Sequence, residues 1–276
     1  MPDIRTEMRS VSTADYKIDF RVAVDRPDEP AYFVLGFRKS GSTMLGTIVN
    51  FLAARTSHNV IDWPGSFFKN GLVVKDWMQL NFENVLVGGN VYSGFRTMPS
   101  NVVQSETFKG ARKVLLVRDP RDVLVSQYFS DQSSHKLPSL DGLSDRGRKE
   151  FLAKRKEALE TPIDKYVVER AVGLGRGMLE YSELLGDPTC LVLKYEVVIF
   201  QKRWMVRKLL NHYGWDVHPS AIEKLMERVD VVPGAEDQKK FIRKVVPGDH
   251  REKLEPSTIK TLNNRLGEVL ELFDYV

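Results

Sequence analysis

Residues 36–43 combine glycines, hydroxyl side chains and cations in an order suited to binding phosphate. The stretch reads Gly-Phe-Arg-Lys-Ser-Gly-Ser-Thr and follows the apolar run 32–35. Gly36 and Gly41 have the Gly-x-x-x-x-Gly spacing of a phosphate-binding loop. In an ATP-hydrolysing loop of this type a lysine follows the second glycine, but here Ser42 takes that place and the lysine is Lys39. The displaced lysine favours a group transfer other than nucleoside triphosphate hydrolysis.

The start of a helix after this loop would itself attract an anion. Its first N–H groups have no partner inside the helix, and the helix dipole places partial positive charge there. Apolar residues between Met44 and Leu52 recur with helical spacing and predict a helix over 43–55. The loop's side chains add hydroxyl donors and full charges: Arg38, Lys39, Ser40, Ser42 and Thr43. The alternative is a Gly/Ser-rich turn without a ligand, because short motifs also occur by chance.

A second candidate anion site follows the apolar run 113–117. Arg118 stands at the predicted tip of this buried strand, and Asp119 and Pro120 suit the N-cap and first position of a following helix. Ser126 lies about two turns into that helix. An arginine at a strand tip binds phosphate through two parallel hydrogen bonds. The alternative is a structural arginine that pairs with a neighbouring aspartate.

Composition indicates a globular protein with an anionic small-molecule ligand. The chain has 276 residues, 42% of them hydrophobic, and a net charge of +4. This mild excess of positive charge does not indicate nucleic acid as a partner. Cys190 is the only cysteine, so no intrachain disulfide forms, which fits a reducing compartment. With no apolar stretch of about 18–20 residues, we expect no signal peptide, no stable membrane insertion and a cytoplasmic location.

Strand and helix signals alternate along the chain. This order predicts an α/β fold, a three-layer sandwich whose central, mostly parallel sheet is flanked by helices. Ligands bind such sheets at the carboxyl ends of the strands, where Lys39 and Arg118 both fall. The predicted strands are 32–36, 91–95, 113–117 and 190–195, and the predicted helices are 43–55, 120–131, 199–213, 219–228 and 257–273.

The domain organisation is expected to be simple. Residues 1–30 are polar and form a lead-in segment, and residues 31–276 form one domain. The stretch at about 132–165 interrupts the alternation with a loop followed by a highly charged helix. A long insertion of this kind is either a lid over an acceptor site or an exposed surface segment.

Four segments, in order, resemble sulfotransferases that use 3′-phosphoadenosine 5′-phosphosulfate (PAPS). Residues 38–43 resemble the family's phosphosulfate loop, usually Pro-Lys-Ser-Gly-Thr-Thr. Arg118, with Ser126 eight residues later, resembles the 3′-phosphate segment. The tyrosine-containing strand is matched by Leu-Lys-Tyr-Glu at 193–196. The Arg-Lys-Gly-x-x-Gly-Asp region is matched by Phe-Ile-Arg-Lys at 241–244 with Gly-Asp at 248–249. The resemblance implies a P-loop NTPase-like fold.

The resemblance also implies residue roles. Lys39 and the backbone of 40–43 would hold the 5′-phosphosulfate, while Arg118 and Ser126 would hold the 3′-phosphate. Further contacts to the nucleotide would come from Tyr195, Phe241, Arg243 and Lys244, and Met44 replaces an aromatic residue that stacks on adenine. The product would be 3′,5′-adenosine bisphosphate (PAP). A sulfuryl group carries less charge than the triphosphate of a kinase substrate, so no metal is expected.

The position of the catalytic base differs from the pattern of the family's cytosolic members. Their Lys-Thr-His-Leu-Pro segment, with histidine as base, corresponds to Phe-Arg-Thr-Met-Pro at 95–99, and Thr97 cannot accept a proton near neutral pH. Carbohydrate-modifying members use an acidic residue after the first helix, where Asp62 stands here. His58 is the second candidate, because its ordinary pKa suits the task. Both could instead be ordinary loop residues.

We therefore expect in-line transfer of a sulfuryl group from PAPS to a hydroxyl, or less readily an amine. Lys39 would stabilise the charge on the leaving oxygen. The acceptor would be a small molecule, a glycan or a lipid, and the protein a monomer or homodimer. The alternatives are a P-loop kinase and a nucleotide-binding protein without catalysis.

Overall fold

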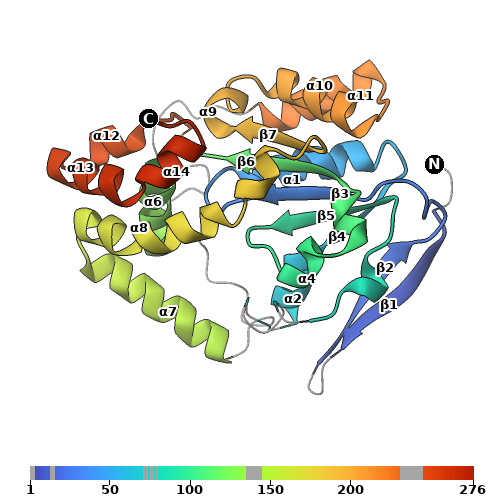
Figure 1. Cartoon of the computed structure of the whole chain (residues 1–276), viewed down its shortest axis with the longest axis horizontal. Coiled ribbons are helices and arrows are strands. Elements are labelled where there is room, and N and C mark those ends of the chain that lie inside the picture. Colours follow the sequence, from blue (N-terminus) through green and yellow to red (C-terminus); the bar gives the residue numbers. More distant parts are fainter. Residues whose placement is uncertain are drawn as a thin grey trace.

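A five-stranded parallel sheet organises the protein, as a computed structural model shows (Figure 1). The structure describes residues 4–12, 16–70, 72, 74, 78, 80–134, 145–230 and 245–276. All neighbouring strands of the sheet are parallel. Their spatial order is β4 (Asn59–Asp62), β5 (Asn90–Phe95), β3 (Tyr32–Gly36), β6 (Arg112–Val117) and β7 (Cys190–Lys194). Because β3 and β6 are adjacent and parallel, the segments that follow them emerge side by side.

The central strand β3 is apolar along its whole length because both faces of the sheet are covered. Every residue of β3 is buried. Tyr32 and Val34 point to one face and Phe33 and Leu35 to the other, each pair within a separate hydrophobic cluster. The first face packs on helices α1 (Ser42–Ala53), α10 (Lys202–Tyr213) and α11 (Pro219–Val229), with the short α9 (Tyr195–Val198) beside them.

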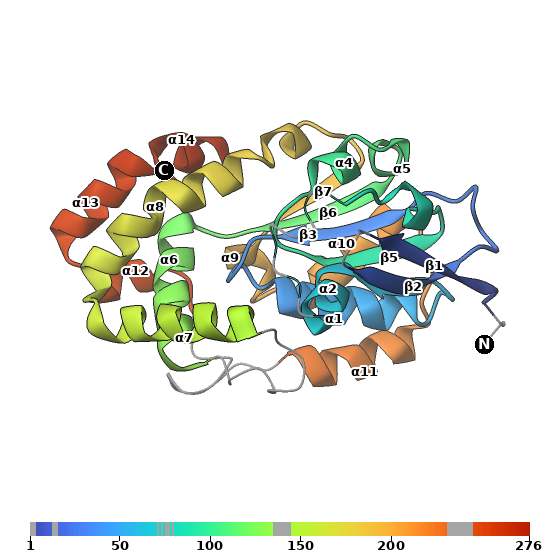
Figure 2. The same cartoon turned by 90° about the horizontal axis from the view of Figure 1, so that it is seen from below.

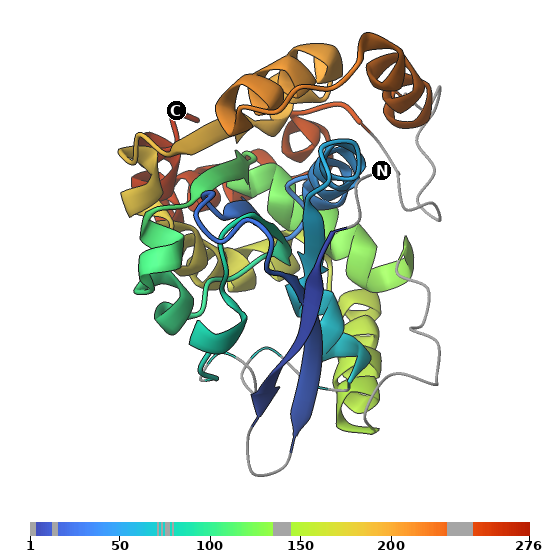
Figure 3. The same cartoon turned by 90° about the vertical axis from the view of Figure 1, so that its right-hand side faces the viewer.

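The second face is covered by short helices and by an N-terminal hairpin. The antiparallel strands β1 (Thr6–Ser12) and β2 (Lys17–Ala23) form this hairpin, seen in Figure 3 as two long blue strands. Phe20 of β2 stacks on Trp63 with 5.1 Å between ring centroids, which anchors the hairpin to the core. The short elements are α2 (Trp63–Lys69), η1 (Glu83–Val85), α4 (Ser100–Val103), α5 (Glu106–Lys109) and η3 (Ser182–Leu185).

A separate group of helices lies beyond the carboxyl end of the sheet (Figure 2). A third hydrophobic cluster holds it together, with Leu124, Tyr166 and Leu262 among its buried members. The group comprises α6 (Pro120–Phe129), a π-helical turn η2 (Ser130–Ser134), α7 (Asp145–Glu160), α8 (Ile163–Leu179), α12 (Asp249–Lys253), α13 (Pro256–Arg265) and α14 (Gly267–Leu272). Within the ranges given above, no helix has the length and apolar character that crossing a membrane requires.

The predicted three-layer α/β fold is confirmed, and the four predicted strands are present to within a residue. The differences lie elsewhere. Residues 1–30 were expected to be a lead-in without strands, yet they contain the hairpin β1–β2. The four-residue edge strand β4 and the glycine-containing helix α8 were not predicted. The helix expected over 257–273 is interrupted at Leu266, where α13 ends and α14 begins.

Candidate active site

The loop between β3 and α1 has the backbone of an anion-binding turn. Lys39 and Gly41 both have positive φ, 65° and 90°. Gly41 is the N-cap of α1, and no side chain caps the helix there, so its first N–H groups could donate to an anion. A Cβ on Gly41 would lie 2.8 Å from Cδ2 of Tyr195. Only glycine therefore fits between this turn and the tyrosine ring.

The loop side chains divide into structural and exposed groups. Ser40 is fully buried, and its hydroxyl donates to the carbonyl oxygen of Phe37 at 2.7 Å, so it closes the turn. Arg38 and Thr43 are exposed, and Ser42 is partly exposed. Met44, one position further, is partly buried and packs on the cluster under α1. The hydrogen-bond donors that a ligand could use are therefore the backbone N–H groups of the loop and the side chains of Arg38, Lys39, Ser42 and Thr43.

Arg118 links the strand β6 to this loop. Its Nη1 donates to the carbonyl oxygen of Lys39 at 3.1 Å, and its guanidinium lies 4.4 Å from the ring centroid of Tyr195. Arg118 is 6% exposed, and its Nε has no hydrogen-bond partner among the described residues. A buried donor without a partner is costly unless a ligand accepts from it. Ser126 lies further along α6 and is partly exposed.

Positive charge is concentrated at this edge of the sheet. Burial, and after it the neighbouring charges of Arg38, Arg118 and Arg96, together lower the pKa of Lys39 to about 8, and Asp131 opposes this shift. The pKa of Arg96 is itself lowered, first by burial and then by Arg38. Cations held this close repel one another, and a bound anion would stabilise them.

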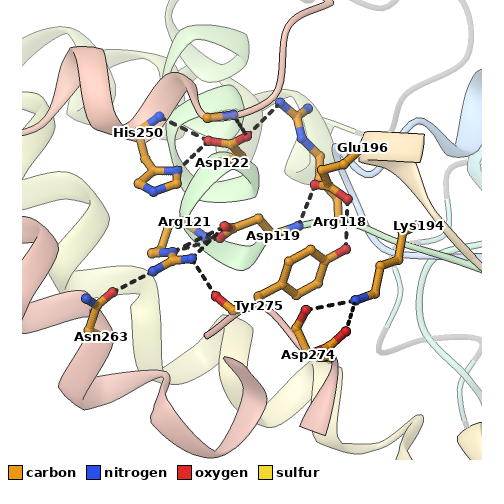
Figure 4. A network of polar contacts seen from close by, with 11 residues as sticks. Arg118, Asp119, Arg121, Asp122, Lys194, Glu196, His250, Asn263, Asp274 and Tyr275 are labelled. Atoms are coloured by element: carbon orange, nitrogen blue, oxygen red, sulfur yellow. Dashed lines mark hydrogen bonds and ion pairs between the residues drawn. The ribbon is translucent and has the colours of Figure 1, made fainter. Parts of the chain in front are cut away.

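A network of polar contacts holds Arg118 and its surroundings (Figure 4). Asp122 forms an ion pair with Arg118 at 3.7 Å and accepts hydrogen bonds from the segment 248–250. Burial alone would raise the pKa of Asp122, but the bonds from His250, the Arg118 charge and the Gly248 amide outweigh it and lower the pKa to about 2.

A second set of contacts in Figure 4 fixes the start of α6. Asp119 is the N-cap and pairs with Arg121 at 2.8 Å. Glu196 accepts from the backbone N–H of Asp119 at 3.0 Å and from the Tyr275 hydroxyl at 2.9 Å. The strand tip that carries Arg118 is thus connected through Glu196 to helix α9, which begins at Tyr195, and to the C-terminal segment.

The two candidate bases lie at opposite edges of the sheet. Asp62 ends β4 and is exposed, and its Oδ1 accepts from the Gly65 amide at 3.1 Å. It faces the backbone of Gly94, because a Cβ there would lie 2.7 Å from the same oxygen. Gly94 belongs to β5, which leads to Arg96. Asp62 therefore shares the carboxyl edge of the sheet with Lys39.

His58 lies at the amino edge of the sheet, which contradicts its prediction as a base. It precedes β4, its ring stacks on Trp215 at 4.7 Å, and its Nε2 lies 3.3 Å from Glu29. It also packs against Tyr32, the first residue of β3, whereas Lys39 follows the end of that strand. A buried histidine a whole strand length away cannot take a proton at the loop.

Three of the predicted nucleotide contacts, Phe241, Arg243 and Lys244, lie outside the described residues. The residues that sequence reasoning missed are Arg96, Asp131 and His250. Arg96 follows β5 directly, as Arg118 follows β6, and this repeated position at a strand tip is the signal that could have identified it.

Comparisons with known proteins agree with this geometry. The family model described as "Sulfotransferase domain" matches residues 29–274. A mouse sulfotransferase complexed with PAP is 14% identical, with 90% of this chain and 86% of that chain covered and a TM-score of 0.59. A retinol dehydratase complexed with retinol and PAP is 16% identical, with 97% and 91% covered and a TM-score of 0.48. No curated protein sequence is significantly similar to the chain. Because the matched domain spans nearly the whole chain, this protein belongs to the sulfotransferase family.

Proposed function

We propose that the protein transfers a sulfuryl group from PAPS to an acceptor hydroxyl. The observation that carries this proposal is the hydrogen bond from Arg118 Nη1 to the Lys39 carbonyl oxygen, 3.1 Å long. It brings two anion-binding segments, 79 residues apart in sequence, into one site. A nucleotide with phosphate groups at both its 3′ and 5′ positions requires two such segments close together.

The residues present fit that nucleotide. Arg118 offers a buried Nε that has no partner within the described part of the chain, and α1 begins without a side-chain cap. We assign the 5′-phosphosulfate to Lys39, to the backbone of 40–43 and to the hydroxyls of Ser42 and Thr43, with Arg38 and Arg96 adding charge. The 3′-phosphate is assigned to Arg118 and Ser126, with Tyr195 beside the adenosine. The mouse sulfotransferase of similar fold was solved with PAP, which is consistent with this assignment.

The chain's own residues would promote the transfer in two ways. PAPS supplies the sulfuryl group and leaves as PAP. Lys39 stabilises the negative charge that develops on the departing bridging oxygen, and the nearby arginines preorganise the site for it. Asp62 accepts the proton from the acceptor hydroxyl. A carboxylate base favours a hydroxyl acceptor over an amine, which is protonated and therefore not nucleophilic near neutral pH.

Labelled PAPS tests the reaction directly. The protein is incubated with it and a panel of sugars, phenols and lipid alcohols, and labelled products are separated from the donor. PAP binding is measured in parallel by calorimetry, with EDTA and with Mg²⁺. We expect PAP to bind equally in both and at least one acceptor to be labelled. ATP binding that requires Mg²⁺, without PAP binding, would instead identify a kinase, and PAP binding without product from any acceptor would identify a non-catalytic nucleotide-binding protein.

A further inference from the structure

Asp122 connects Arg118 to a segment far away in the sequence. Its Oδ2 accepts from the Gly248 amide at 2.6 Å and lies 3.7 Å from Arg118 Nη2. Its Oδ1 accepts from the backbone N–H of His250 at 3.0 Å. The carboxylate therefore bridges helix α6 and the start of helix α12, as Figure 4 shows.

The His250 imidazole adds a fourth contact to the same carboxylate. Its Nδ1 lies 2.7 Å from Asp122 Oδ1, and the side chains are 3% and 0% exposed. Because an ionised carboxylate has no proton to give, Nδ1 is the donor. Oδ1 thus accepts hydrogen bonds from both the backbone N–H and the imidazole of His250. This pair of bonds fixes the plane of the carboxylate, so that Oδ2 is directed toward Arg118.

Within the described part of the chain, a backbone carbonyl, an aromatic ring and a carboxylate orient Arg118. The Lys39 carbonyl oxygen, the Tyr195 ring and the Asp122 carboxylate contact its guanidinium. Of the three, Asp122 is the only one that carries a charge. At 3.7 Å it orients the guanidinium without a short hydrogen bond, so the guanidinium keeps donors for a ligand.

The geometry points to His250 as a positioning residue for nucleotide binding, one that acts through Asp122 on Arg118. The inference rests on the proposed function, because it assumes that Arg118 binds the 3′-phosphate. Removal of the imidazole leaves the carboxylate with one backbone donor on each oxygen and without the bond that reinforces its orientation. Arg118 then loses its fixed orientation, and part of its preorganisation for the phosphate is lost.

Three variants test this role by calorimetry with PAP. His250→Ala removes the donor. His250→Asn keeps an N–H donor close to the position of Nδ1. His212→Ala is the matched control, because the His212 ring is also hydrogen-bonded, 2.8 Å from the Lys113 carbonyl oxygen, but at the amino end of β6, away from Arg118.

We expect His250→Ala to weaken PAP binding by about tenfold, and His250→Asn to stay within about threefold of wild type. His212→Ala should bind PAP like wild type. In turnover assays His250→Ala should raise the KM for PAPS while kcat and the acceptor KM change little, which a general loss of stability would not produce.

The outcomes separate this inference from the proposed function. Wild-type protein that fails to bind PAP would overturn both. Normal PAP affinity in His250→Ala, or an equal loss in His250→Asn, would overturn the positioning role alone. Should His250→Ala not fold, residue-resolved hydrogen exchange on the wild type decides: PAP must slow exchange at the Gly248 and His250 amides more than in α13, and equal protection would reject the role.

Discussion

The main-chain carbonyl oxygen of Lys39 accepts a hydrogen bond from the guanidinium of Arg118. One residue belongs to the loop after β3 and the other to the tip of β6, so the contact crosses between two neighbouring strands. It also ties the left-handed backbone of Lys39 to a buried cation. Changes at either residue should therefore affect the same ligand.

Arg118→Ala should weaken PAP binding by more than tenfold, because charge-assisted hydrogen bonds contribute roughly 1.5–3 kcal/mol. Arg118→Lys should recover only part of this, since an ammonium cannot contact the Lys39 carbonyl, the Tyr195 ring and a phosphate together. Calorimetry with PAP measures both. Affinity equal to wild type in Arg118→Ala would remove Arg118 from the nucleotide site.

Lys39→Ala should abolish turnover while the protein remains folded, because the side chain is only partly buried. Circular dichroism checks the fold and labelled PAPS checks the turnover. Residual activity above a few per cent of wild type would contradict a role for the ammonium in stabilising the leaving oxygen.

The pKa of Lys39 predicts the alkaline limb of the rate profile. With a pKa of about 8 in the free enzyme, the side chain is charged below that pH and loses its proton above it. Hence kcat/KM for PAPS, which reports the free enzyme, should fall as pH rises through about 8. A kcat/KM that stays flat up to pH 10 would show that the charge of Lys39 is not required.

Asp62→Asn should lower kcat and leave PAP affinity unchanged, because the base acts on the acceptor and not on the nucleotide. We expect a loss of about 10²–10⁴-fold, the usual contribution of a general base. Asp62→Glu should retain part of the activity. Equal rates for wild type and Asp62→Asn would direct the search for the base to another residue at the same edge.

Gly41→Ala should destabilise the loop and abolish PAP binding together. The added methyl group would meet the Tyr195 ring at 2.8 Å, and the φ of 90° is unfavourable for any residue with a Cβ. We expect a loss of about 1–3 kcal/mol in unfolding free energy. Thermal unfolding and calorimetry measure the two effects, and Gly46→Ala, where a Cβ meets only the Ser93 hydroxyl at 3.6 Å, is the control.

Acid should destabilise the protein through Asp122. Its pKa of about 2 in the folded state lies below the ordinary value of 3.8, so the carboxylate contributes stability that is present above pH 4 and lost as pH falls through 2. The difference corresponds to roughly 2 kcal/mol. The free energies of unfolding of wild type and Asp122→Asn, measured in urea, should converge as pH falls from 5 to 2. A difference that stays constant over this range would contradict the contribution of Asp122.

The sequence predicted those parts of the fold that local patterns determine. Apolar runs identified β3, β6 and β7, the stretch 91–95 was also predicted as a strand, and the rule for parallel sheets placed Lys39 and Arg118 at one edge. The hairpin carried a signal too, because residues 17–22 alternate polar and apolar, and the structure buries every second one. Its charged residues made it look like an unstructured lead-in.

The remaining parts of the site depend on tertiary packing. His250 and Asp122 are 128 residues apart, and no local pattern connects them. His58 had a suitable side chain and a suitable position after the first helix, but it precedes β4 whereas Asp62 ends it. The four residues of β4 therefore separate His58, at the amino end of the sheet, from the carboxyl end where Lys39 lies.

The adjacency of β3 and β6 fixes the distance between the two segments proposed to bind the donor. Neighbouring strands are about 4.8 Å apart whatever chain joins them. The loops between α1 and β6 can therefore change in length during evolution without altering the spacing of β3 and β6. Acceptor preference can therefore change through these loops while the residues that bind the donor keep their positions.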